Sequence, residues 1–208
     1  MAERKLQEII TELLFRIKFA KEYLDCCLAY NEIRNNISYL NVYIQARSYM
    51  TVTNRATVVA LMMELAKLCE TTEKKKEAQS FNRFLNRCIT SSEISRDKKK
   101  EIEPIINLAR ETWESYRFKE MRNRIIFRRD KLYAHYDKGF FLDEDRALDC
   151  GDINYEDIKD LIALMHNTCE EVFCLLSGRT WSEKCHQKTY EPDRNCFDVL
   201  DMLGRTAE

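Results

Sequence analysis

Apolar residues recur every three or four positions along most of the chain, which is the spacing of one buried face of an α-helix. One such stretch covers residues 2–34, and a second covers residues 37–69. The turn between them falls at Asn35 and Asn36, because asparagine tolerates left-handed backbone and hydrogen-bonds its own neighbours. Residues 51–53 are all β-branched, so we predict a kink or break of the second helix at these residues. The apolar stripe of the first helix consists of Leu6, Ile9, Leu13, Ile17, Ala20, Leu24, Cys27 and Leu28.

The middle of the chain alternates charged and helical segments. Residues 71–79 form a charged connection, and Ser80 after them has a side chain preferred at helix N-caps. The charged run 96–103 is interpreted as the solvated start of a helix, with a nucleic-acid contact through the lysines at 98–100 as the alternative. Pro104 fits the first turn of a helix better than its middle, because its missing N–H costs nothing there. The long helix expected from this point carries Ile105, Leu108, Ala109, Trp113, Tyr116, Ile125 and Ile126 on its apolar stripe.

The last long helix has the clearest pattern in the chain. Gly139 ends the preceding helix, since glycine adopts the left-handed C-cap conformation without strain. After a loop with several acids, Asn154 and Asp157 resemble a capping arrangement, and Gly178 ends the helix that follows. A short terminal helix is predicted at residues 196–203. The stripe of the last long helix consists of Ile158, Leu161, Ile162, Met165, Cys169, Val172, Phe173 and Leu176.

These elements predict an all-α, up-and-down bundle of four long helices with short accessory helices. The bundle is expected to cover residues 1–178, and residues 179–208 to form an irregular segment and short helix packed on it. Four glycines and two prolines are few for 208 residues, and none of them precedes Pro104. Their scarcity supports helical structure. An apolar content of 45% excludes a disordered chain.

Charge and cysteine usage narrow the choice of partners. The net charge of −1 gives nucleic acid no overall attraction, so such a partner has to meet a local patch. No apolar run approaches the ~20 residues that span a bilayer, and no membrane partner is expected. The nine cysteines occur without a signal peptide or a CxxC pair, so we interpret them as reduced thiols of a cytoplasmic protein. Cys185 and His186 lack a second pair of ligands, so no metal or cofactor is predicted.

A local basic patch lies at residues 117–137, RFKEMRNRIIFRRDKLYAHYD. Seven of the fifteen residues from Arg117 to Lys131 are basic, against two acids, and His135 follows shortly after. An arginine, a neighbouring acid and a histidine that titrates near neutrality can bind and cleave a phosphodiester. The alternative is a basic face exposed only to solvent, with His135 capping the carbonyls at its helix end.

Two arginines, Arg128 and Arg129, are candidates for the arginine that acts together with His135. Arg128 is seven residues before His135, which places the two within roughly 20° of each other on an α-helix. Arg129 is six residues before it and diverges by roughly 120°. Helical geometry therefore favours Arg128, but an arginine side chain is long and a helix can loosen near its end.

The segment RRDKLYAH resembles the R-x(4–6)-H signature of the HEPN superfamily, α-helical proteins many of which are metal-independent endoribonucleases. More narrowly, residues 1–178 resemble the bacterial abortive-infection (AbiU-like) HEPN branch. The shared features are two long first helices, a Leu-rich segment such as LMMELAKL, the segment RDKLYAHYD and a final helix at GDINYEDI. A polar residue follows the arginine in that family. The resemblance therefore implies Arg129, Asp130 and His135 as catalytic residues and ranks Arg129 above Arg128.

The resemblance also implies a reaction without metal or cofactor. His135 would take the proton of a ribose 2′-OH or protonate the departing 5′ oxygen, while the arginine would hold the nonbridging phosphate oxygens. The products would be a 2′,3′-cyclic phosphate and a 5′-OH, which restricts the substrate to RNA. A homodimer with a composite site, a role in phage defence or as a toxin, and an antitoxin or defence-system partner follow from the resemblance alone. The residues expected to bind RNA or its phosphates are Arg128, Arg124, Arg122, Lys131 and Tyr136.

The chain departs from the family pattern at one position. HEPN toxins that a nucleotidyltransferase antitoxin silences often have tyrosine two residues after the histidine. Asp137 stands there, with Tyr136 directly after His135, which puts control by modification in doubt. Asp130 either orients a catalytic side chain or forms an ordinary salt bridge. For the whole chain, the alternative is a non-catalytic HEPN-like helical dimer that binds a partner protein, nucleotide or RNA.

Overall fold

A computed structural model of the chain describes residues 2–70, 80–92, 94–133 and 153–181. These ranges are helical throughout apart from short connections and contain no strand, so the all-α prediction is confirmed. None of the helices they contain is both long enough and apolar enough to cross a membrane. The long helices are α1 (Ala2–Asn35), α3 (Arg47–Cys69), α5 (Arg96–Glu114) and α9 (Tyr155–Ser177). The short elements are η1 (Ile37–Tyr39), α2 (Leu40–Gln45), α4 (Phe81–Thr90), α6 (Tyr116–Arg128) and η2 (Arg129–Tyr133).

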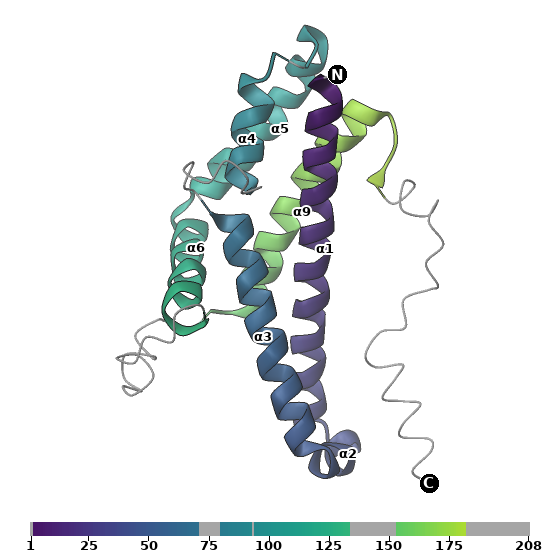
Figure 1. The fold of residues 1–208 in the computed structure, drawn as a ribbon, viewed down its shortest axis with the longest axis vertical. Helices are drawn as coiled ribbons and strands as arrows, with labels where there is room; N and C mark the ends of the chain where they lie inside the picture. The colour runs from purple at the N-terminus through teal and green to yellow at the C-terminus, as the bar shows by residue number, and fades with distance from the viewer. Residues whose placement is uncertain (1, 71–79, 93, 134–152, 182–208) are drawn as a thin grey trace.

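The long helices pack lengthwise into an elongated bundle. Helices α1 and α3 lie antiparallel and side by side, and α9 packs along α1 (Figure 1). Helix α5 packs against both α9 and α4, while α6 flanks α3 on the side away from α1 (Figure 1). The short helix α2 forms one end of the long axis, where the chain reverses from α1 into α3. As a result, the two ends of α3 lie in different surroundings.

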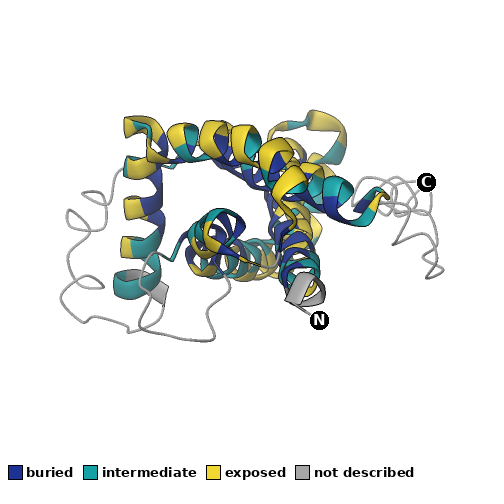
Figure 2. Cartoon of the chain, turned by 90° about the horizontal axis from the view of Figure 1, so that it is seen from above, coloured by how far each residue is buried: buried dark blue, intermediate teal, exposed yellow. Residues whose placement is uncertain are grey.

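The core forms where the apolar stripes of the helices face one another. Figure 2 shows the buried residues as dark blue bands on the inward faces of the helices. On α1, the expected stripe is buried except for Ile9 and Leu28, which are half-buried. All eight expected stripe residues of α9 are buried. These two stripes were predictable because each helix keeps one phase along its whole length.

The second predicted helix is interrupted, but not at residues 51–53. Those residues lie inside α3, and the break falls at Ala46, after the short helix α2. Three β-branched residues weaken a helix only slightly, so packing of α3 against α1 outweighs their low propensity. The predicted turn at Asn36 is confirmed, since its side chain accepts a hydrogen bond from the Ser38 N–H at 3.0 Å.

The long helix expected after Pro104 differs from the structure in three ways. The start at Arg96 confirms the charged run 96–103 as the solvated start of a helix, but it places Pro104 inside α5 and not in its first turn. The helix ends at Glu114, and α6 begins at Tyr116 after Ser115. Pro104 and the residue four positions before it are both exposed, so water can reach the carbonyl that loses its helical partner. Leu108 and Tyr116, predicted on the stripe, are exposed, the former by 68%. Ile102 and Ile106 are buried instead. Ala109, Trp113 and Ile125 of the predicted stripe are buried as expected, and Ile105 and Ile126 are half-buried, so the error is confined to Leu108 and Tyr116.

The predicted caps are largely confirmed. Ser80 accepts a hydrogen bond from the Arg83 N–H at 3.4 Å, and Asn154 accepts one from the Glu156 N–H at 3.0 Å. Gly178 ends α9 with a φ of 68°, the left-handed conformation that favours glycine. Beyond it, Trp181 packs its ring against Phe15 of α1, with ring centroids 4.7 Å apart. The domain division at residue 178 stays a prediction. The helix expected at 196–203 and the C-cap at Gly139 lie outside the described residues.

The cysteines of the described helices behave as small apolar residues. Cys27, Cys69, Cys88 and Cys169 are buried free thiols. Burial raises the pKa of Cys27 to about 11 and the pKa of Cys69 and of Cys88 to about 12. Burial also raises the pKa of Cys169 well above its usual value. All four thiols therefore stay protonated at neutral pH, and a protonated thiol is a poor nucleophile.

This protonation leads to a testable difference in reactivity. At pH 8, iodoacetamide is expected to alkylate Cys69 and Cys88 at least tenfold more slowly in the folded protein than in urea, because burial removes both access and thiolate. Peptide mapping by mass spectrometry after timed quenching measures each cysteine separately. Equal rates in the folded and unfolded protein would contradict the packing of α3 and α4.

Candidate functional site

The basic patch coincides with a change of helix type. Helix α6 ends at Arg128, and Arg129–Tyr133 continue it as a single π-helical turn, η2. The Arg129 N–H still approaches the Ile125 and Ile126 carbonyls, four and three residues back, so the wider turn begins only after this bond. Single π-helical turns inside α-helices occur frequently at functional sites. The angles expected between arginine and histidine assumed an α-helix here, so they do not apply.

Two carboxylates hold the guanidinium of Arg129. Its Nε donates a hydrogen bond to Asp130 Oδ1 at 2.7 Å, and its Nη1 lies 3.9 Å from Glu70 Oε1. The side chains of Arg129 and Glu70 are 18% and 17% exposed, whereas that of Asp130 is 46% exposed. A guanidinium has five N–H donors, so these contacts orient the group while donors remain for a ligand. The salt bridge between Asp130 and Arg129, one of the two expected roles of Asp130, is present.

Glu70 is the residue of this site that the sequence did not reveal. It follows α3 as its C-cap, with extended backbone, and it faces η2 because α3 packs against both α6 and η2. Nothing in the local pattern connects Glu70 with Arg129, since the two lie on different elements far apart in the chain. In the sequence, Glu70 is one of several acids near the end of the second helix, and nothing distinguishes it from the others.

Arg122 is not on the basic surface, and its expected role as a phosphate contact is wrong. It is 4% exposed, and its guanidinium carbon lies 4.1 Å from the centre of the Trp113 ring. The Nη2 atom of Arg122 also pairs with Glu114 Oε1 at 3.4 Å. A weakly hydrated, planar guanidinium can stack on an aromatic ring in the core, which a sequence pattern of charges does not reveal.

The other predicted RNA contacts differ in what the structure says of them. Arg124 is exposed, and Arg128 and Lys131 are half-buried. All three make contacts within the chain, so their roles as phosphate contacts stay predictions. His135 and Tyr136 lie outside the described residues, as does Asp137. The lysines at 98–100 lie on the first turns of α5, and the ammonium of Lys98 donates to the Leu176 carbonyl at 3.1 Å.

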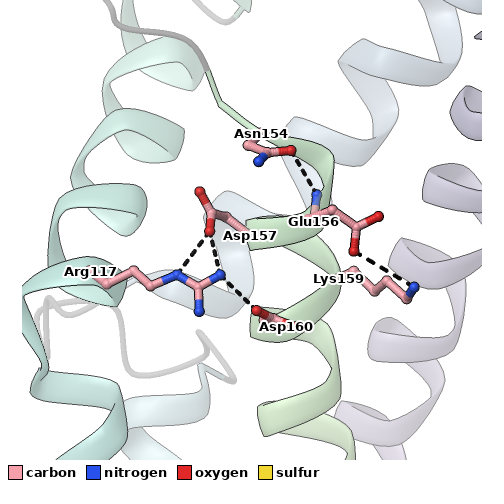
Figure 3. A network of polar contacts seen from close by, with 6 residues as sticks. All are labelled: Arg117, Asn154, Glu156, Asp157, Lys159 and Asp160. Atoms are coloured by element: carbon pink, nitrogen blue, oxygen red, sulfur yellow. Dashed lines mark hydrogen bonds and ion pairs between the residues drawn. The ribbon is translucent and has the colours of Figure 1, made fainter.

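Arg117, at the other end of α6, is engaged with α9 (Figure 3). Its Nε donates to Asp157 Oδ1 at 2.8 Å, and its Nη2 binds both Asp157 and Asp160, the latter at 2.6 Å. Hydrogen bonds to Asp157 and then Asp160 raise the pKa of Arg117. The predicted capping by Asp157 is therefore wrong, because its carboxylate faces α6 and Asn154 alone caps α9 (Figure 3). This network connects the start of α6 with the start of α9.

The described residues contain no cluster of three or more His, Cys, Asp or Glu side chains arranged to hold a metal ion. Cys185 and His186 lie outside those residues. His166 is half-buried on α9, beside the apolar stripe.

Comparison with protein families assigns the chain to a known family. The family model named HEPN_AbiU2, described as AbiU2, matches residues 4–194. The chain belongs to the AbiU2 family of HEPN proteins. Membership in the AbiU2 family confirms the resemblance seen in the sequence and the HEPN helical fold, and it associates the chain with abortive infection. Searches of curated proteins and of solved structures find no match to this chain.

For this AbiU2 family member, the structure assembles part of the predicted site. Arg129 and Asp130 are in contact, and Glu70 joins them from α3. Arg122 is not part of this site, because it is buried in the core against Trp113, and Arg117 binds Asp157 of α9. The match of the AbiU2 family spans residues 117–137, which include the segment RRDKLYAH.

Proposed function

We propose that the protein is a metal-independent endoribonuclease of the HEPN type. The observation that supports this most is the guanidinium of Arg129, held by Asp130 and Glu70 on a π-helical turn at the end of a basic helix. Membership in the AbiU2 family also supports the proposal, because many HEPN proteins are metal-independent endoribonucleases. A donor that carboxylates hold in place needs little reorganisation when charge develops on a phosphate.

In the proposed reaction, Arg129 binds the nonbridging oxygens of the scissile phosphate. His135 takes the proton of the ribose 2′-OH, whose oxygen attacks the phosphorus in line with the bond to the 5′ oxygen. That bond breaks, and the 5′ oxygen leaves with a proton supplied by an imidazolium. The products are a 2′,3′-cyclic phosphate and a 5′-OH. Asp130 and Glu70 orient Arg129 and do not touch the substrate.

One arginine and one histidine per chain make a sparse site. We therefore propose a homodimer in which both copies contribute to one cleft. The role extends the association with abortive infection: RNA cleavage would serve phage defence or a toxin function, controlled by an antitoxin or another defence-system partner.

The ends of the RNA products test the reaction. Purified protein incubated with mixed RNA in EDTA is expected to produce fragments with a 2′,3′-cyclic phosphate and a 5′-OH, because the proposed groups need no metal. End-specific ligation and mass spectrometry identify both termini. Activity that EDTA abolishes, or products with a 5′-phosphate, would contradict the mechanism.

A second function is favoured by one observation. Arg129 is mostly buried and pairs with two carboxylates of its own chain, which is also what a structural salt bridge would look like. In that case the chain is a non-catalytic helical dimer that binds a partner protein, nucleotide or RNA. Binding of RNA without any product, weakened by salt, would support it.

A further inference from the structure

A second group of arginines lies at the opposite end of α3 from Arg129, where α1, α2 and α3 meet (Figure 1). Residues 35–63 contain no aspartate, glutamate or lysine. Arg34, Arg47 and Arg55 are all exposed, and no ion pair to a carboxylate is found for them within the described residues. Glu32 is the nearest acid in sequence and is also exposed. Among the described residues, this end of the molecule therefore carries net positive charge.

At this end of the molecule, two tyrosines from different helices pair with each other. The hydroxyl groups of Tyr30 and Tyr43 lie 3.5 Å apart, and their ring centroids are 6.2 Å apart at an interplanar angle of 66°. Tyr30 and Arg34 lie one turn apart on α1, Tyr43 lies on α2, and Arg47 begins α3. We call these four residues the tyrosine–arginine cluster. It joins three helices, so its geometry is set by the fold.

The field at the cluster is positive. The hydrogen bond with Tyr30 lowers the pKa of Tyr43, and the charges of Arg34 and Arg47 also lower it. Both guanidinium groups therefore act on the same phenol. An anion placed beside Tyr43 would meet the same two charges.

The elements that carry the cluster also carry apolar side chains that are open to solvent. Tyr49 is 72% exposed, and Ile37, Ile44 and Val52 are also exposed. An exposed tyrosine offers a flat face on which an unpaired base can stack, a contact that is tolerant of sequence. A planar guanidinium binds phosphate through two N–H groups at once. Arginines can bind the phosphates of a single nucleic-acid strand, and tyrosines can stack on its bases. A lipid surface offers phosphates but no bases, so the strand matches this group of side chains better.

We propose that the tyrosine–arginine cluster binds single-stranded RNA at a contact remote from Arg129. Arg34 and Arg47 bind phosphates, Tyr43 contacts the nucleotide beside them, and the exposed Tyr49 of α3 offers a base a further stacking face. The proposal rests on the proposed function, because it assumes RNA as the substrate. Helix α3 has 23 residues, which corresponds to about 34 Å between the two sites. A single strand stacked at the duplex rise of ~3.4 Å per nucleotide covers this distance with about ten nucleotides, and a more extended strand needs fewer.

Binding to uncleavable RNA tests this contact separately from catalysis. The probe is a fluorescent 20-nucleotide 2′-O-methyl RNA, which has no 2′-OH to attack, and anisotropy measures its Kd. The variant Arg34→Glu/Arg47→Glu is expected to raise Kd at least tenfold at 0.1 M salt. It should also reduce the slope of log K against log salt by about 1.4, since each single-strand phosphate contact contributes about 0.7.

A matched control changes the same charge elsewhere. Arg96 and Arg179 are exposed at the other end of the bundle, so Arg96→Glu/Arg179→Glu should alter Kd by less than threefold. Tyr49→Ala should weaken binding without changing the salt slope, because stacking releases no counterions. Circular dichroism confirms that each variant is folded.

The possible outcomes separate the two proposals. If wild-type protein cleaves RNA but the cluster variant binds as tightly as wild type, the RNA contact is overturned and the nuclease stands. If nothing cleaves RNA but the cluster variant still loses binding, the contact stands and the nuclease does not. Loss of binding to phosphatidylglycerol vesicles, with RNA binding unchanged, would assign the cluster to a membrane surface and overturn the proposal.

Discussion

Replacing Arg129 with alanine is expected to lower RNA cleavage by about 10²- to 10³-fold, which is the typical cost of removing one preorganised donor from developing charge. The loss should appear in kcat, because the guanidinium is held for the transition state by Asp130 and Glu70. A quenched fluorescent RNA measures the rate. Substrate saturation then separates kcat from KM.

Three further variants make the result specific. His135→Ala is expected to abolish cleavage, and equal activity in that variant would rule out this site. Arg128→Ala is the neighbouring control and should raise KM with little change in kcat. If Arg128→Ala abolishes cleavage and Arg129→Ala does not, the catalytic arginine is Arg128. Glu70→Gln should lower kcat about tenfold and leave KM unchanged, as expected of a residue that positions Arg129.

Stability measurements exclude a trivial explanation of these losses. Removing Arg129 leaves Glu70 mostly buried without its partner, so we expect the free energy of unfolding to fall by about 1–2 kcal/mol. Urea denaturation of each variant measures this. If Arg129→Ala and Glu70→Gln destabilise the protein equally and no variant changes activity, the salt bridge is structural and the non-catalytic function is favoured.

Replacing Trp113 with alanine is expected to lower the free energy of unfolding by about 3–5 kcal/mol, as is typical of a large aromatic residue lost from a core. Trp113 is fully buried, packs its ring 4.9 Å from that of Phe81 and covers the guanidinium of Arg122. Its removal therefore creates a cavity and leaves a buried charge without its aromatic neighbour. Urea denaturation followed by circular dichroism measures the change.

Leu108→Ala is the matched control on the same helix. Leu108 is exposed, so its truncation should change the free energy of unfolding by no more than about 0.5 kcal/mol. The pair also tests the phase of α5. A large loss for Leu108→Ala together with a small one for Trp113→Ala would mean that α5 presents the opposite face to the core.

The helical class, the stripes of α1 and α9 and the caps at Ser80, Asn154 and Gly178 were predictable from the sequence. Each depends on local rules: one helical period, one side-chain oxygen near an N–H, or one glycine that accepts positive φ. The break at Ser115 was missed because the apolar periodicity crosses it without a glycine or proline. The exposure of Leu108 was also missed, although Ala109 and Trp113 on the same helix are buried as predicted.

By itself, the sequence determined that this is a helical member of a HEPN-like family with a basic segment around Arg129, because helical period and short motifs are properties of neighbouring residues. Only the tertiary structure decided which charges are surface groups. It placed Arg122 on Trp113, brought Glu70 to Arg129 and turned Asp157 towards Arg117. A charged side chain takes its partner from whichever helix packs beside it, and that helix is chosen by apolar burial across the whole bundle.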